Sequence, residues 1–132
     1  MIRRYGRPWP ERAHRDMMGM SSPEWSRYMH DVIELPEPPE EISAEVVRRM
    51  LARYEAELPL IEGAVEAVGR LAGSFRLGLA SSSNRPLIDV VLERSGLARY
   101  FETTVSSEEV AHGKPAPDVF LEAARRDRKS VV

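Results

Sequence analysis

The sequence predicts an α/β protein, with a parallel sheet and flanking helices that follow a purely helical N-terminal part. Up to about Leu58, apolar residues recur at helical spacing, and proline-rich joints separate the segments. Beyond Pro59, short apolar strands alternate with helices, in the order typical of right-handed parallel β/α units. We therefore expect one unit over residues 1–58 and a second over residues 59–132.

Three helices are expected in the N-terminal part. A loosely helical pattern runs from Pro10 to about Met20, and Pro23 opens a second helix, where its missing N–H is not needed. Residues 35–39 contain three prolines and are expected to form a rigid, extended connection. The third helix covers about residues 43–58. Its predicted buried face consists of Ile42, Val46, Val47, Met50, Leu51, Tyr54 and Leu58.

The C-terminal part is expected to alternate between helices and short strands. Turn residues separate these segments, and Gly96 is suited to end a helix because glycine readily adopts positive φ. The expected elements are a helix over residues 64–71, a strand over 75–80, a helix from Pro86 to Gly96, a strand over 103–106 and a helix from about Asp118.

Composition limits the class of protein. The 132 residues are 42% hydrophobic, enough for a buried core, and the net charge of -2 gives no general attraction to nucleic acid or to an anionic membrane. The absence of cysteine excludes disulfides, thiolate metal sites and cysteine nucleophiles. No apolar run is long enough for a membrane span or a signal peptide. We expect a cytoplasmic protein, and the sequence does not indicate an oligomeric state.

A polar run joins the first predicted strand to the helix at Pro86. It consists of Ser81, Ser82, Ser83 and Asn84. At the end of a strand and the start of a helix, free backbone N–H groups and the helix dipole favour an anion such as phosphate. Serine and asparagine before a helix are also ordinary N-caps, so the run by itself has two interpretations.

A second polar element follows the second predicted strand. Lys114 comes directly after Gly113 and is followed by Pro115 and Pro117, which make the loop stiff. A lysine held in this way suits a phosphoryl oxygen or a catalytic carboxylate. The alternative is an ordinary surface turn, in which two prolines around one basic residue would be unusual.

In this order the two elements resemble motifs of the haloacid dehalogenase (HAD)-like hydrolases. Residues 79–83 are similar to the second motif of the family and residues 112–120 to its third, in the branch of beta-phosphoglucomutase-like and phosphoglycolate phosphatase-like enzymes. The resemblance covers most of the chain. It implies a partial Rossmann-like core over residues 59–132 and a helical cap domain over residues 1–58, with residues 19–25 as the substrate-facing loop of the cap.

The resemblance also implies an activity. It is Mg²⁺-dependent phosphoryl transfer from a small phosphorylated metabolite, by a phosphatase or a phosphomutase. Ser81 would bind a phosphoryl oxygen, and Lys114 would pair with both the nucleophile and the phosphoryl group. Ser82, Ser83 and Asn84 would bind substrate phosphate. Ser22 replaces the cap arginine of the mutases, which favours a phosphatase. Dehalogenation is not distinguished by these residues.

The nucleophile of the family is missing from this sequence. The family uses an Asp-x-Asp pair, but no two of the five aspartates lie within eight positions of one another. We therefore expect a fragment of such a hydrolase, inactive alone and without its metal ligands, in which the strand over residues 75–80 has an unpaired edge. The alternative hypothesis is a non-catalytic helical interaction module with a β/α remnant.

Overall fold

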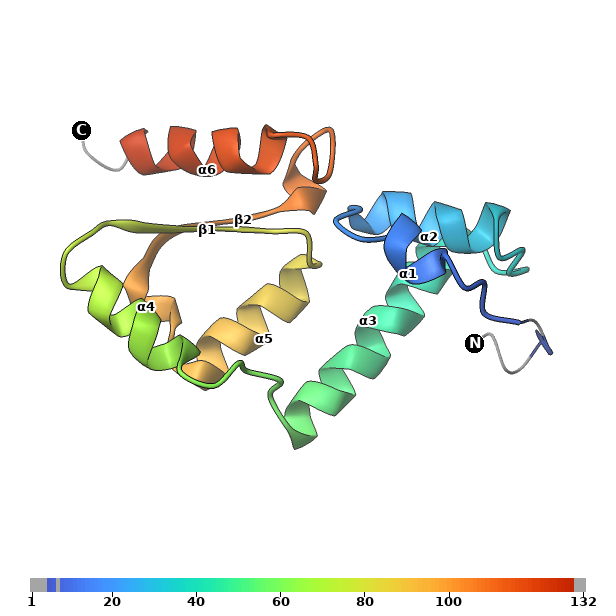
Figure 1. Cartoon of the computed structure of the whole chain (residues 1–132), viewed down its shortest axis with the longest axis horizontal. Helices are drawn as coiled ribbons and strands as arrows, with labels where there is room; N and C mark the ends of the chain where they lie inside the picture. The colour runs from blue at the N-terminus through green and yellow to red at the C-terminus, as the bar shows by residue number, and fades with distance from the viewer. Residues whose placement is uncertain (1–4, 7, 130–132) are drawn as a thin grey trace.

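A computed structural model of the chain describes residues 5, 6 and 8–129, for residue 129 the backbone only. Figure 1 shows the elements in space. The helices and strands are α1 (Ala13–Asp16), α2 (Ser22–Asp31), α3 (Pro39–Ala56), α4 (Ala64–Ala72), β1 (Leu77–Ser81), α5 (Arg85–Ser95), β2 (Phe101–Ser106) and α6 (Asp118–Lys129). Two 3-10 turns, η2 (Ala98–Tyr100) and η3 (Ser107–Glu109), flank β2.

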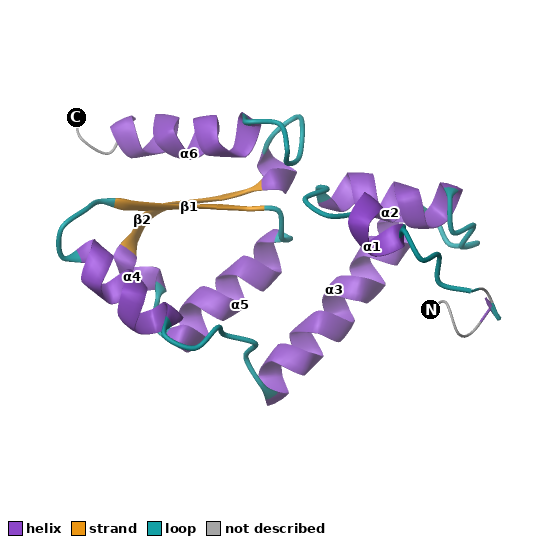
Figure 2. Cartoon of the chain, viewed as in Figure 1, coloured by secondary structure: helices purple, strands orange, loops and turns teal. Residues whose placement is uncertain are grey.

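The sheet lies between two layers of helices. β1 and β2 run parallel, with Leu79 opposite Thr104 and Ser81 opposite Ser106. Helix α6 covers one face of the sheet, and α4 and α5 cover the other (Figure 2). Leu79 packs towards α5, whereas its neighbour Ala80 packs towards Val119 of α6, because successive side chains of a strand point to opposite faces. The predicted α/β fold with a parallel sheet and flanking helices is confirmed.

Helices α1–α3 form a helical region with its own apolar core. Met29 of α2 and Ile33, which follows the end of α2, pack against Ile42 of α3. Ile42 is completely buried. The sheet region, from α4 to α6, has separate clusters around Leu92 and Val105. The two regions meet where α3 packs against α5 and where α2 approaches η3.

Two helix boundaries differ from the expectation. Helix α3 begins at Pro39, four residues earlier than predicted, because Pro39 occupies the first turn, where no N–H donor is needed. The extended connection is correspondingly shorter. Helix α1 has only four residues and ends at Asp16, and the turn that follows it includes Gly19 with a φ of +84°. The predicted buried face of α3 is half-buried beyond Ile42.

No helix within the described part of the chain is both long enough and apolar enough to span a membrane.

Candidate active site

The end of β1 carries the first predicted polar group. Ser81 is the last residue of the strand, and its hydroxyl accepts a hydrogen bond from the backbone N–H of Ser83 at 3.1 Å. The turn that follows is tied to the end of β2, because Ser106 Oγ donates to the Ser83 carbonyl at 2.7 Å and Ser107 Oγ to the Ser82 carbonyl at 3.2 Å. The serine turn is thus held in place by the neighbouring strand.

Asn84 is oriented by Glu108 of η3. Its side chain is buried, and its Nδ2 donates to Glu108 Oε1 at 2.8 Å. The other oxygen of the same carboxylate accepts from the backbone N–H of Arg85 at 2.7 Å. Asn84 makes no side-chain capping bond, so the start of α5 is capped by Glu108 from another segment and not by the serine-asparagine run. One of the free N–H groups expected to attract an anion is therefore used within the fold.

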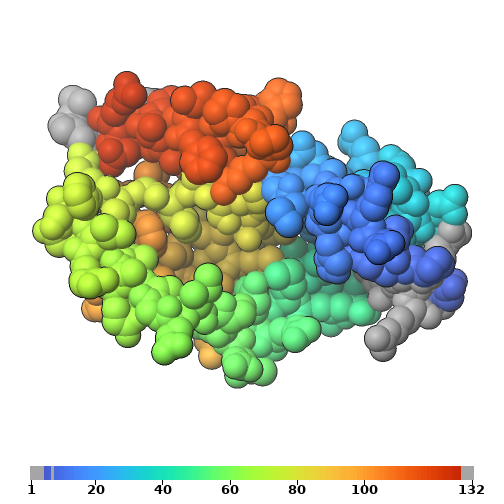
Figure 3. All heavy atoms as spheres, viewed as in Figure 1, coloured from blue at the N-terminus to red at the C-terminus, as the bar shows by residue number. Residues whose placement is uncertain are grey.

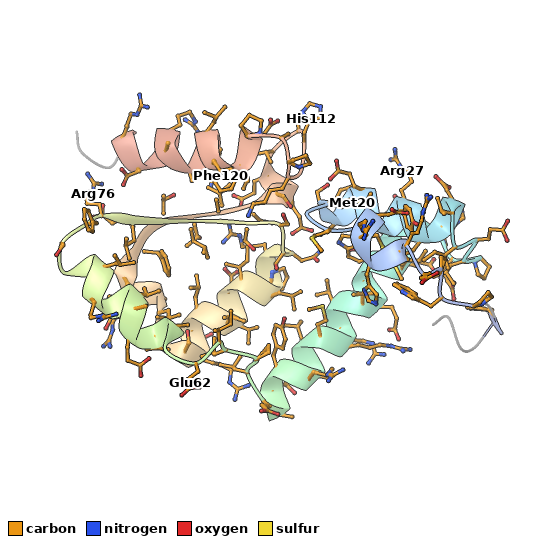
Figure 4. All side chains as sticks on the ribbon, in the orientation of Figure 1. Met20, Arg27, Glu62, Arg76, His112 and Phe120 are labelled. Atoms are coloured by element: carbon orange, nitrogen blue, oxygen red, sulfur yellow. The ribbon has the colours of Figure 1, made fainter. Side chains whose placement is uncertain are left out.

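Lys114 is brought to the same end of the sheet. Its Nζ donates to the carbonyl of Ala80, the neighbour of Ser81, at 3.1 Å, and lies 4.9 Å from the centre of the Phe120 ring. Phe120 projects from the start of α6 on the side of the sheet (Figure 4). The peptide bond between Lys114 and Pro115 is cis. The structure thus places Lys114 next to the strand end that carries Ser81, although the two residues lie far apart in the sequence.

A loop of the helical region reaches the same place. Ser82 Oγ donates to the carbonyl of Gly19 at 3.1 Å. Ser21 and Glu24, at the start of α2, form a capping box, in which Glu24 Oε2 accepts from both the backbone N–H and the hydroxyl of Ser21 at 2.6 Å. The first of these contacts joins residues 19–24 to the serine turn.

The Glu24 carboxylate is held in its ionised form. Hydrogen bonds from the hydroxyl and the backbone N–H of Ser21 lower the pKa of Glu24, and burial opposes them. The backbone of Gly113 and the nearby His112 lower this pKa further. The negatively charged Glu24 carboxylate therefore lies beside the Lys114 loop and interacts with residues of both regions.

Glu24 and Gly113 lie in predicted segments, the substrate-facing loop over residues 19–25 and the motif over residues 112–120, but neither was predicted to have a role of its own in the site. The Ser-x-x-Glu signal of the capping box is present in the sequence, but by itself it predicts only the start of a helix. The contact between Glu24 and Gly113 depends on how the helical region docks on the sheet region, and no local sequence pattern predicts this docking.

Two of the clefts near this end of the sheet reach predicted site residues. One, of about 310 Å³, lies under β1 and is lined mainly by apolar side chains, including Leu79, Leu87 and Phe101, and it reaches Ser81. The other, of about 400 Å³, lies between the helical region and the start of α5 and includes Ser22, Arg27 and Asn84 in its lining. The surface between α6 and α4 is hollowed in the view of Figure 3.

The described residues do not by themselves form a Mg²⁺ site. Within that part of the chain, no three His, Asp or Glu side chains are grouped as a metal site requires. Two aspartates near the sheet already have partners, since Asp118 accepts from His112 at 3.0 Å and Asp127 pairs with Arg76 at 3.1 Å.

Comparison with known proteins identifies the family. The family model of the haloacid dehalogenase-like hydrolases matches residues 2–128. The chain is 30% identical to a bifunctional riboflavin kinase/FMN phosphatase of Arabidopsis thaliana, over 96% of this chain and 34% of that protein. It is 33% identical to the fructose-1-phosphate phosphatase YqaB of Escherichia coli, over 80% of this chain and 56% of that protein.

The fold is also similar to that of a solved structure. A crystal structure assigned to a beta-phosphoglucomutase of Thermotoga maritima aligns with a TM-score of 0.58 at 26% identity, over 95% of this chain and 58% of the other. The chain thus spans between about a third and three fifths of the length of these relatives. The match over nearly all residues shows that this chain belongs to the haloacid dehalogenase-like hydrolase family.

Proposed function

We propose that the end of β1 binds the phosphoryl group of a small phosphorylated metabolite, as part of a phosphatase. The observation that carries this proposal is the position of Lys114 Nζ, 3.1 Å from the carbonyl next to Ser81. From there the ammonium group has a short path to an oxyanion held by the Ser81 hydroxyl. A charged donor and a neutral donor at the same strand end suit a phosphoryl oxygen.

The remaining predicted residues have supporting roles in this proposal. Ser83 is the most exposed of the serines and is free to offer its hydroxyl to substrate phosphate. Ser82 reaches the phosphate only when its hydrogen bond to Gly19 opens. Asn84 fixes the turn through Glu108, so its contribution to phosphate binding is indirect.

The carboxylate pair must come from outside this sequence. None of the five aspartates forms an Asp-x-Asp pair. A strand laid along the edge of β1 that faces away from β2 would cover the apolar cleft and bring its residues next to Ser81 and Lys114. Such a pair would supply the nucleophile and, together with further acidic ligands, hold the Mg²⁺ that offsets the charge of the phosphate. We expect no turnover by the 132 residues alone.

The relatives support a class of substrate. FMN and fructose 1-phosphate, the compounds named for two of them, both carry phosphate on a primary carbon of a hydroxylated chain. We propose the same class of phosphomonoester here. In this proposal residues 1–58 form a cap domain, and the cleft at Ser22 and Arg27 accommodates the hydroxylated part of the substrate.

The proposal is tested by ligand binding. Lys114→Met is expected to weaken the binding of fructose 1-phosphate by about tenfold or more, since one charge-assisted hydrogen bond is lost. Titration calorimetry and ³¹P NMR measure the affinity. Lys129→Met is the matched control, because Lys129 is the only other lysine. Equal affinities for the two variants would contradict the site, and turnover that Lys114→Met abolishes would contradict the expected inactivity.

A further inference from the structure

The loop before α2 and the loop that carries Lys114 are in backbone contact. A Cβ atom on Gly19 would lie 3.2 Å from the Lys114 carbonyl oxygen and 3.3 Å from the Lys114 Cβ. A Cβ atom on Gly113 would lie 2.6 Å from the backbone nitrogen of Ser21 and closer still to the Glu24 carboxylate. The buried residue Gly113 therefore leaves space for the start of α2, and no larger side chain would fit.

Glu24 is the charged group in this contact. Its Oε2 accepts two hydrogen bonds from Ser21, which lie on the side of its own helix. Gly113 approaches the same carboxylate from the sheet region. One side chain thus joins the first turn of α2 to the residue that directly precedes Lys114.

The contact continues to β1 on both sides of the site. From Gly113 the chain passes to Lys114, whose Nζ is bonded to Ala80. From Gly19 a hydrogen bond leads to Ser82. Residues 19–24 therefore contact both elements of the proposed phosphate site.

We propose that Glu24 is a positioning residue that holds the Lys114 loop against the end of β1. The proposal rests on the proposed function in one respect, namely that Lys114 contacts the phosphate. Glu24 itself does not touch the substrate. It acts through the backbone of Gly113, and its loss lets the Lys114 loop move away from Ser81.

The alternative role of Glu24 is to cap helix α2 without holding the Lys114 loop. If the carboxylate only capped α2, its removal would loosen that helix and leave the Lys114 loop unchanged. Glu24→Gln keeps the size of the side chain but removes its charge, and Gly113→Ala places a Cβ atom against the amide of Ser21 and the Glu24 carboxylate, so both variants disturb the contact between the two loops. Exchange at residues 113 and 114 in Glu24→Gln separates the two roles, because the loss of a helix cap alone would change exchange only within α2. Glu45→Gln is the control, since Glu45 pairs with Arg48 and Arg49 on the exposed side of α3.

The experiment measures amide hydrogen exchange and phosphate affinity on the whole chain. In Glu24→Gln and Gly113→Ala we expect exchange at residues 113 and 114 to accelerate by about tenfold, and the affinity for fructose 1-phosphate to fall by about threefold to tenfold. Circular dichroism verifies that each variant is folded, and Glu45→Gln matches the parent in both measurements.

Two outcomes separate this inference from the proposed function. Unchanged exchange at residues 113 and 114 in Glu24→Gln overturns the positioning role, whatever the phosphate data show. If exchange accelerates but Lys114→Met binds phosphate as the parent does, the docking of Glu24 stands. The proposed function is then overturned, together with the part of this inference that concerns phosphate binding.

Discussion

The two outer edges of the sheet are completed in different ways. At the edge of β2, the Thr104 carbonyl accepts from Arg85 Nη2 at 3.0 Å and from Arg126 Nη1 at 3.5 Å, and Arg85 Nη1 donates to the Thr104 hydroxyl at 2.9 Å. Glu109 accepts from both arginines. At β1, the Ala80 carbonyl accepts from the ammonium group of Lys114, beside an apolar cleft.

Under the proposed function, the difference separates a structural edge from a binding edge. An exposed strand edge is a template for pairing with another strand, and covering it with charged side chains prevents this pairing. Side chains from α5, η3 and α6 cover β2 in this way. The β1 edge is approached by Lys114 of the proposed phosphate site, and the proposal predicts that this side chain contributes to binding more than to stability. The following predictions test this contrast.

The largest effect is expected at the β2 edge. Arg85→Met should lower the free energy of unfolding by about 2 to 3 kcal/mol, because Glu109 and the Thr104 carbonyl lose a partly buried, charged partner. Urea denaturation followed by circular dichroism measures the change. Arg48→Met, which breaks an exposed pair on α3, should change stability by less than about 0.5 kcal/mol. Similar losses in both variants would show that the β2 edge has no special role.

The stabilisation that Glu109 gives to the β2 edge is expected to depend on pH. Burial raises the pKa of Glu109, but the Ser106 N–H and the two arginines outweigh it and lower the pKa from 4.5 to about 2. Because the folded pKa is below the ordinary value, the carboxylate stabilises the fold fully above about pH 4.5 and loses this contribution as pH falls towards 2.

Glu109→Gln should therefore lower stability by about 1 to 2 kcal/mol at neutral pH and flatten the loss of stability between pH 4.5 and 2. Thermal unfolding as a function of pH measures both effects. The control is Glu66→Gln, at an exposed position of α4. An unchanged pH profile in Glu109→Gln would contradict the stabilising role of the carboxylate.

The smallest effect on stability is expected at the β1 edge. Lys114→Met should change the free energy of unfolding by less than about 0.5 kcal/mol, because methionine keeps an apolar contact with Phe120 and water can solvate the Ala80 carbonyl. The same denaturation experiment measures it. A loss as large as that of Arg85→Met would remove the distinction between the two edges.

Much of the fold could be predicted from the sequence because its signals are local. Pro86 and Gly96 mark the start and end of α5, and the apolar runs mark β1 and β2. The start of α3 was misplaced because a proline pair is compatible both with an extended segment and with a first helical turn.

The site was predictable only in part. Ser81 and Lys114 could be placed at one end of the sheet because Ser81 ends a strand and Lys114 lies in the loop after the next strand. The capping of α5 by Glu108 and the meeting of Glu24 with Gly113 join segments that are distant in the sequence, and the sequence alone gives no register for such contacts.

Gly113 shows what this kind of contact demands. A single added methyl group there would overlap the amide of Ser21, on a helix almost a hundred positions earlier in the chain. In a saturation mutagenesis screen, a residue without any functional group should thus tolerate as few replacements as the lysine beside it, and for steric reasons alone.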